Sequence, residues 1–185
     1  MGDIRERLRL LEKDYELEPV RVLVLRDVEI PTPSGVTRVQ RGEELDLPRW
    51  QARELREKGV VDIKEAEIGS EDIARVHFAE VHSRGAIQLA QLPPRFYLKV
   101  REYIESLNRA IKENPSPSLF NDRANTEKLL ADIVDRRLNK IVRLVVAGGD
   151  DSVLDKMTPE EKILYKTLLD TIRSWRDEII GYLGR

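Results

Sequence analysis

The sequence predicts an α+β fold in which a small N-terminal β-rich domain, residues 1–66, precedes a larger all-α helical bundle domain, residues 67–185. The period of the apolar residues changes along the chain. Up to Ile63 they tend to alternate with polar residues, as in strands, whereas from Ser70 onward they recur at steps of three and four, as in helices. The length of 185 residues suits one domain or two small ones. The boundary is therefore expected between Ile63 and Ser70.

The β-rich half opens with a strand expected over Val20–Ile30, which is rich in β-branched residues and alternates apolar with polar side chains. Pro31–Gly35 should form a turn, because its prolines fix φ and its glycine permits a positive φ. Val36–Gln40 is then the expected returning strand, and Arg41–Glu43 a second turn. The segment before Val20 is charged, and no role is assigned to it.

A short helix is expected to begin at Pro48, since proline fits the first turn of a helix, and to end at Gly59. Val60–Ile63 closes the unit as a strand. A unit of this size is marginal in isolation, so it should pack against a neighbour. The residues expected to form its packing are Leu47, Pro48, Trp50 and Leu55.

The helical half begins with a helix from Ser70 that carries Glu80 near its end. Prolines break the chain at Leu92–Pro94. A second helix follows from Phe96, with apolar residues at steps of three and four. The proline-rich segment Asn114–Ser118 is expected to be the loop after it.

The longest helix is expected to run from Asn125 or Thr126 to Ala147, with Gly148–Gly149 as its C-terminal cap. Wrapped at about 100° per residue, its apolar residues fill roughly half of its circumference. Arg137 breaks this segregation, because it lies inside the apolar arc. An unpaired buried charge costs several kcal/mol, so we expect a structural ion pair with an acid on a neighbouring helix. Snorkelling of Arg137 at the edge of the arc is the alternative.

The last helix is expected from Thr158, where Thr-Pro-Glu-Glu is a capping box with proline at the first helical position, to about Leu183. Asp150–Asp155 before it should be a loop. Helices with such broad apolar faces either fill a bundle core or share an interface with another subunit, so oligomerisation is expected. The residues expected in this helical core or subunit interface are Phe96, Tyr97, Val100, Ile104, Leu138, Ile141, Leu168, Ile172 and Trp175.

The polar face of the longest helix carries Arg136, Lys140 and Arg143. These residues are candidates for contact with DNA phosphates or with an acidic partner. The alternative is a solvated face, on which Asp132 and Asp135 are the (i, i+4) partners of the basic residues.

The sequence contains no constellation of catalytic residues, so we expect no enzyme activity, no cofactor and no metal. It has no cysteine, and its two histidines, His77 and His82, are five residues apart rather than the four of zinc-protease helices. The net charge of −2 creates no field that draws the chain to DNA, so DNA contact should be indirect or weak. No apolar run approaches the ~18 residues of a membrane span, so a cytoplasmic location is expected.

Four segments, in a consistent order, resemble those of the GINS family of replication proteins. The third resembles the family's long helix with its Asp-x-Arg-x-x-Lys pattern, whose positions are Asp135, Arg137 and Lys140 in this chain. The first resembles the small β domain, and the second and fourth resemble the starts of a major helix and of the closing helix. The segments are Arg41–Gly59, Leu92–Ile104, Leu130–Ile141 and Met157–Glu161.

The resemblance implies a non-catalytic scaffold subunit in DNA replication. A β domain that comes first resembles the archaeal type related to the eukaryotic Psf-two and Psf-three subunits. The implied role is to link and activate the MCM replicative helicase with a Cdc-forty-five or RecJ-like protein in a CMG complex. Implied partners are also the other GINS subunit type, in a tetramer, and primase or DNA polymerase, at a nucleoid-associated replisome in the cytoplasm.

Two other function classes stay open on the residues alone. A dimeric DNA-binding regulator would use the β unit as a wing and the helices for dimerisation, and would bind duplex DNA tightly in a salt-dependent way. An enzyme with its site assembled at a subunit interface would hold a bound metal or cofactor when purified.

Overall fold

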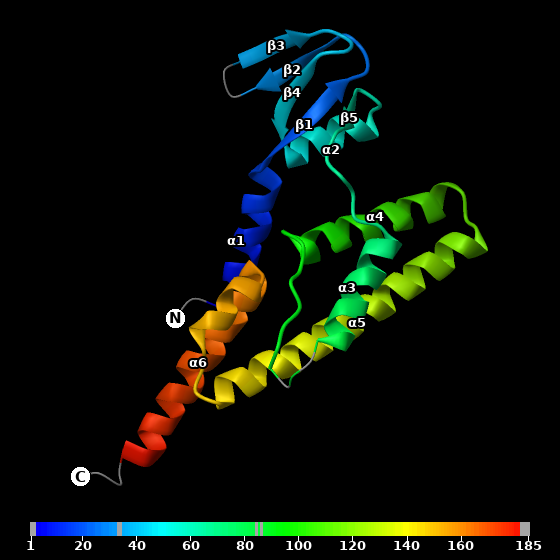
Figure 1. Cartoon of the computed structure of the whole chain (residues 1–185). Helices are drawn as coiled ribbons and strands as arrows, with labels where there is room; N and C mark the ends of the chain where they lie inside the picture. The colour runs from blue at the N-terminus through cyan, green and yellow to red at the C-terminus, as the bar shows by residue number, and fades with distance from the viewer. Residues whose placement is uncertain (1–2, 33–34, 84, 86, 182–185) are drawn as a thin grey trace. The chain divides into compact units, whose positions relative to one another are not determined.

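The computed structural model describes residues 3–32, 35–83, 85 and 87–181, and the chain forms two compact units (Figure 1). A β-rich unit comprises Arg9–Glu67, and a helical unit comprises Met1–Leu8 and Ile68–Arg185. The predicted α+β fold class is confirmed. The start of the chain groups with the helical unit, although the sequence analysis assigned residues 1–66 as a whole to the β-rich domain.

The β-rich unit contains a three-stranded antiparallel sheet in the order β4-β1-β5 and a separate hairpin of β2 with β3. The charged start of the chain forms a helix, α1, whose residues from Arg9 onward belong to this unit. The elements are α1 Ile4–Leu17, β1 Pro19–Val24, β2 Val28–Thr32, β3 Gly35–Val39, β4 Glu44–Pro48, α2 Arg49–Glu57 and β5 Val61–Ile63.

The single strand expected over Val20–Ile30 is wrong, because the chain turns at Leu25–Asp27 and forms two strands with different partners. The Asp27 carboxylate accepts the backbone N–H of Arg41 at 2.8 Å, which fixes this turn. Val28 and Ile30 return to the even-numbered apolar register of Val20, Val22 and Val24, so the interruption at Arg26 and Asp27 was read as part of one strand. Strand β4 was not expected from the sequence, because its exposed acidic residues have low strand propensity.

The core of the β-rich unit is formed by valines of β1 together with Ile30, Leu47 and Val61. Leu55 is partly buried against this core, and Pro48 is the half-buried N-cap of α2. Trp50, which was expected in the packing, is instead 44% exposed. The inner face of α2 is taken by Arg49, Gln51 and Ala52, with the Arg49 guanidinium 4.1 Å from the centre of the buried Tyr15 ring and 2.6 Å from Glu65.

In the helical unit, α5 is the long element against which α3, α4 and α6 pack (Figure 1). One apolar cluster joins α3, α4 and α5 around Phe96 and Ile133, and a second joins α5 and α6 around Ile141 and Tyr165. No helix among the described residues is long and apolar enough to cross a membrane. The elements are α3 Ser70–His82, α4 Phe96–Glu113, α5 Pro117–Val146, the 3-10 helix η1 Asp151–Lys156 and α6 Pro159–Ile180.

The start of α5 differs from the expectation by two turns. The helix begins at Pro117, because the Ser116 hydroxyl accepts the backbone N–H of Leu119 at 3.3 Å and proline occupies the first helical position. The expected helix start at Asn125 or Thr126 is therefore wrong. The loop expected over Asp150–Asp155 is likewise mostly the 3-10 helix η1.

The capping box at the start of α6 is confirmed. The Thr158 hydroxyl accepts the backbone N–H of Glu161 at 3.4 Å, and the Glu161 carboxylate accepts that of Thr158 at 3.0 Å. The glycine stop of α5 is also present, with Gly148 and Gly149 at φ 108° and 83°. The expected end of the last helix at Leu183 lies outside the described residues.

Candidate functional site

The site is built around a buried arginine, Arg137, which is 0% exposed in the C-terminal half of α5. Its Nε donates to Glu161 Oε1 at 2.5 Å and its Nη2 to Glu161 Oε2 at 2.7 Å, a bidentate pair with α6. Its Nη1 donates to Glu80 Oε2 on α3 at 2.9 Å. The arginine that the sequence placed inside an apolar arc therefore has two carboxylate partners on two neighbouring helices.

The remaining guanidinium donors reach two backbone carbonyls. Nη1 donates to the oxygen of Ala90 at 2.8 Å, and Nη2 donates to the oxygen of Lys156 at 3.0 Å. All five N–H donors of Arg137 are thus used. One side chain connects α3, the segment before α4, the end of η1 and the start of α6, which are far apart in sequence.

The two carboxylates are fully engaged as well. Glu80 accepts Lys140 Nζ at 2.5 Å and the backbone N–H of Ala90 at 3.1 Å, and Glu161 accepts the Tyr97 hydroxyl at 2.6 Å. Two cations balance two anions, so the cluster is neutral. We call this set, Arg137, Glu80, Glu161, Lys140 and Tyr97, the Arg137 cluster.

The pKa values of Arg137 and Tyr97 are both raised, so both groups stay protonated at neutral pH. Burial alone lowers the pKa of Arg137, but hydrogen bonding and charge attraction from Glu161, with further attraction from Glu80, raise it on balance. Burial, and then the Glu161 carboxylate, raise the pKa of the Tyr97 phenol well above 10.0. A general acid or base needs a pKa near the working pH. Neither Arg137 nor Tyr97 meets this requirement, so the arrangement fits a structural role.

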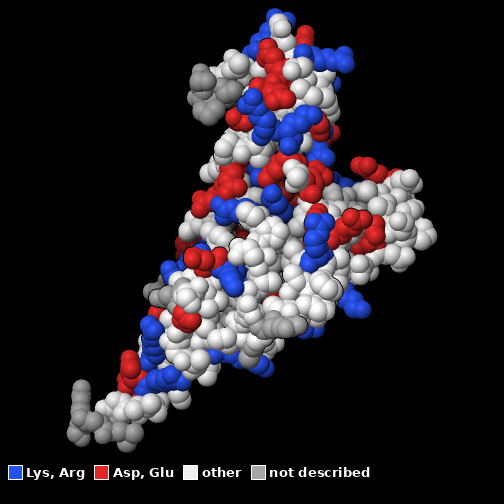
Figure 2. All heavy atoms as spheres, viewed as in Figure 1, with Lys and Arg blue, Asp and Glu red and all other residues white. Residues whose placement is uncertain are grey.

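The structure does not bring the three basic candidates of α5 into one surface. Arg136 donates to Asp132 at 2.7 Å, and Asp132 also contacts His77 at 2.6 Å. Lys140 is turned toward Glu80, with its side chain 14% exposed, so it is not available to a partner. Arg143 alone of the three is exposed without an ion pair among the described residues. On the face drawn in Figure 2, acidic and basic side chains are interspersed over each unit.

Each histidine contacts another group of the helical unit, and His77 pairs with Asp132 as described above. His82 stacks on Phe78 with ring centres 3.9 Å apart, and its Nδ1 lies 2.8 Å from the Phe78 carbonyl oxygen. Within the described part of the chain, no three potential ligands come together to hold a metal ion.

An exposed row of apolar side chains runs along α5. Val134, Leu138, Val142 and Val146 follow at steps of four, which places them on one side of the helix. Their exposed fractions are 40%, 39%, 39% and 51%. We call this row the α5 stripe. Leu138 was expected in the helical core or a subunit interface, and it is exposed in this row. Helical periodicity alone does not tell which part of an apolar arc stays exposed.

The other residues expected in the helical core or subunit interface include buried, partly buried and exposed side chains. Phe96, Val100 and Ile141 are buried, whereas Trp175 is 63% exposed on the last turns of α6. Ile179 and Ile180 on the same turns are also exposed. The partly buried residues, which pack against the two apolar clusters, are Tyr97, Ile104, Leu168 and Ile172.

Comparison with known families decides what kind of protein carries these features. The model of the GINS complex protein helical bundle domain (Sld5) matches residues 57–180, which is more than half of the chain and includes α3 to α6. The chain belongs to the GINS family. A search of curated proteins gave no match.

The resemblance read from the sequence is thereby confirmed at the level of the family. As a GINS protein, the chain is a subunit of a replication complex, and its partners include other GINS subunits. The matched range holds the whole Arg137 cluster and the α5 stripe. The cluster therefore belongs to the helical bundle that defines the family match.

Proposed function

We propose that this GINS protein is a non-catalytic scaffold whose helical unit packs against another GINS subunit through the α5 stripe. The stripe is the observation that carries the proposal. It places four aliphatic side chains in a row on the longest helix, each between 39% and 51% exposed. Large contiguous apolar surface on a soluble protein is typical of interaction sites.

The energetics favour association through this surface. Fully burying a valine or leucine side chain is worth about 1.5–3 kcal/mol, and a side chain that is 40% exposed still has a substantial part of this to gain. The four residues would form the apolar centre of an interface whose rim comes from neighbouring polar side chains. Trp175 and Ile179 add a second apolar surface on α6.

We further propose that the chain is an archaeal subunit of the type related to Psf-two and Psf-three. The order of its units, β-rich before helical, supports this assignment. In that role it assembles with the other GINS subunit type as a heterotetramer. The complex links and activates the MCM helicase with a Cdc-forty-five or RecJ-like protein, and contacts primase or DNA polymerase, at a cytoplasmic replisome. Contact with DNA is indirect or weak, in line with the dispersed charges and the inward orientation of Lys140.

The proposal is tested by placing one charge on the stripe. Leu138→Asp and Asn139→Asp introduce the same charge at adjacent exposed positions of α5, but only the first lies in the α5 stripe. Each variant is co-expressed with the other GINS subunit type, and the mass in solution is measured by light scattering. Leu138→Asp should abolish the complex while Asn139→Asp leaves it intact, with unchanged helix content in both. Full assembly by Leu138→Asp would refute the role of the stripe.

A further inference from the structure

Three neighbouring rows of side chains run along the C-terminal half of α5, each with steps of four residues. The first row is buried, with exposed fractions of at most 1%, and consists of Ile133, Arg137, Ile141 and Val145. The second row is the α5 stripe. The third row is polar and exposed, and consists of Asp135, Asn139 and Arg143. The stripe therefore lies between the core of the helical unit and a polar row.

The polar row holds two charges that have no partner within the described part of the chain. The charged residues between Leu130 and Ala147 are Asp132, Asp135, Arg136, Arg137, Lys140 and Arg143. Arg136 pairs with Asp132, and Arg137 and Lys140 pair within the Arg137 cluster. The exposed side chains of Asp135 and Arg143 form no ion pair with any described residue.

Asp135 and Arg143 do not neutralise each other. They lie a little more than two turns apart, about 12 Å along the helix axis. Ion pairs along one helix form between residues three or four positions apart. Because the two charges have opposite signs, the polar row is acidic toward the N-terminus of α5 and basic toward its C-terminus. An occupant of the α5 stripe would meet this polarity along one side.

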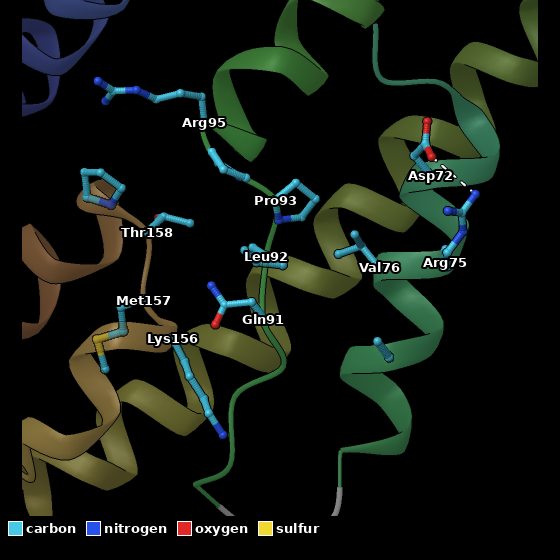
Figure 3. A pocket seen from close by; sticks show the side chains of 13 residues that line it. Asp72, Arg75, Val76, Gln91, Leu92, Pro93, Arg95, Lys156, Met157 and Thr158 are labelled. Carbon is cyan, nitrogen blue, oxygen red and sulfur yellow. Dashed lines mark ion pairs between the residues drawn. The ribbon is translucent and has the colours of Figure 1, made fainter. Parts of the chain in front are cut away.

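A pocket of about 550 Å³ on the same unit lacks such a pattern (Figure 3). It is lined by α3 and by the segments before α4 and α6. Arg75 lies 3.3 Å from Asp72, as the dashed line in Figure 3 shows, and Arg95 also interacts with another residue of the chain. Lys156 alone does not define a charge pattern that would select a partner.

We propose that Asp135 and Arg143 determine the orientation in which a helix of the other GINS subunit type packs on the α5 stripe. This inference rests on the proposed function and names the chemistry of the partner surface. The partner helix places aliphatic side chains against the stripe, a lysine or arginine beside Asp135 and a carboxylate beside Arg143. Charged groups at the polar rim of an apolar interface fix its register and suppress wrong partners.

The geometry of the stripe is compatible with this contact. A row with steps of four is an i±4n ridge, and two helices that pack such ridges together cross at about −50°. Helices at this angle diverge on both sides of the crossing point, which confines the apolar contact to the middle of the stripe. Leu138 and Val142 form this middle, and Asp135 and Arg143 lie on opposite sides of it. Each charge can therefore meet a different end of the partner helix.

Exchanging the two charges tests the proposal. Asp135→Arg combined with Arg143→Asp keeps the net charge and the stripe, but it places like charges of the two subunits together. Binding of the full chain to the purified other GINS subunit type is measured by surface plasmon resonance. The exchange should weaken binding by about tenfold or more at ~0.1 M salt, mainly through slower association. The loss should be smaller at ~1 M salt, where exposed charges are screened.

Two control variants separate orientation from folding. Asp135→Glu combined with Arg143→Lys keeps both charges in place and should bind as the wild type does. Lys166→Asp combined with Asp170→Lys makes the same kind of exchange at exposed positions of α6 and should also bind normally. Circular dichroism should give equal helix content for all variants, so that a loss of binding is not a loss of folding.

The charge-retaining variant also identifies the partner residue. A carbodiimide joins an amine to a carboxylate that contacts it. The amine introduced by Arg143→Lys should therefore become linked to an aspartate or glutamate of the other subunit, and mass spectrometry of the linked peptides locates that residue. Absence of this link from position 143 would overturn the proposal, as would equal affinity of the exchange variant and the wild type.

A second copy of this chain is the other candidate occupant. In a pair of identical chains the exchange reverses both surfaces at once, so complementarity would be preserved. Dimers of the chain alone that are abolished by Leu138→Asp and unchanged by the exchange would identify a second copy as the occupant and overturn the proposal. If Leu138→Asp prevents assembly with the other GINS subunit type while the exchange has no effect, only the proposed orientation is wrong. Full assembly by Leu138→Asp would instead refute the proposed function.

Discussion

Replacing Arg137 with methionine should destabilise the helical unit by about 3–4 kcal/mol. The change keeps an unbranched side chain of moderate size but leaves two buried carboxylates without their shared cation. Removing one partner of a buried ion pair typically costs about 3–5 kcal/mol. Lys140 still neutralises Glu80, so the cost should lie in the lower part of that range. Glu161 is the buried carboxylate that loses its cation.

Urea unfolding measures this loss. Ellipticity at 222 nm follows mainly the helical unit, because most helical residues lie there. Trp50 lies in the β-rich unit and Trp175 in the helical unit. In a Trp175→Phe background, the fluorescence of Trp50 therefore reports on the β-rich unit alone. The helical transition of Arg137→Met should move to lower urea while the Trp50 transition stays in place.

A double-mutant cycle identifies the ion pair as the cause. Glu161→Gln keeps the capping interaction with Thr158, because glutamine also serves at this position of a capping box. Combined with Arg137→Met, it removes the orphaned charge, so the double variant should be more stable than the sum of the two single losses implies. A loss below about 1 kcal/mol for Arg137→Met, or strict additivity, would refute the reasoning.

Four further substitutions test contacts within the helical unit by the same unfolding measurements. Tyr97→Phe should cost about 1 kcal/mol at neutral pH. Since the folded-state pKa of Tyr97 is raised, its contribution should persist up to pH 10.0 and disappear as pH rises through the folded-state value. Gly149→Ala should cost about 2–3 kcal/mol, because the added Cβ would lie 2.6 Å from a tyrosine hydroxyl, whereas Gly148→Ala, with open space, should cost about 1 kcal/mol. Asp132→Asn should cost about 0.5 kcal/mol at pH 7. Hydrogen bonds from Arg136 and His77 lower the pKa of Asp132, so this difference is present above pH 3.8 and should vanish as pH falls through the folded-state pKa. Equal effects of the two glycine variants, or pH-independent effects at Tyr97 and Asp132, would contradict the contacts described.

The sequence could single out Arg137, because a lone cation in an apolar arc is visible from helical periodicity. It could not identify Glu80 as a partner, since that residue lies 57 positions away and reads as an ordinary polar residue of its own helix. Glu161 was recognised only as the third residue of a capping box. Its second role, as the partner of Arg137, depends on how α5 and α6 pack, which local patterns do not contain.

The predicted boundaries of helices and strands were wrong where one local sequence signal is compatible with two structures. Ser116-Pro117 marks a loop in one reading and the cap and first residue of a helix in another, and the structure shows the second. The turn at Leu25–Asp27 was missed because the same apolar register resumes at Val28 after the interruption at Arg26. Lys140 was placed on the polar face by its angle alone, whereas its long side chain reaches back to Glu80.

Surfaces were less predictable than elements. The apolar arc of α5 was evident from the sequence, but the α5 stripe is only the part that the other helices leave uncovered. The pocket lined by α3 and by the segments before α4 and α6 combines residues that packing brings together. The sequence of any one of these segments therefore does not predict it. Such features follow from tertiary structure, and pattern analysis of one sequence cannot supply them.

The account rests on the claim that this chain works as a GINS subunit, and native co-purification tests it most directly. The tagged full chain is purified from extract of its own cells at moderate salt, and the accompanying proteins are identified by mass spectrometry, with Leu138→Asp as the matched control. The account predicts that the other GINS subunit type accompanies the wild-type chain in comparable amount, together with MCM, and is lost from Leu138→Asp. Recovery of the wild-type chain with neither a GINS-type subunit nor MCM would contradict it.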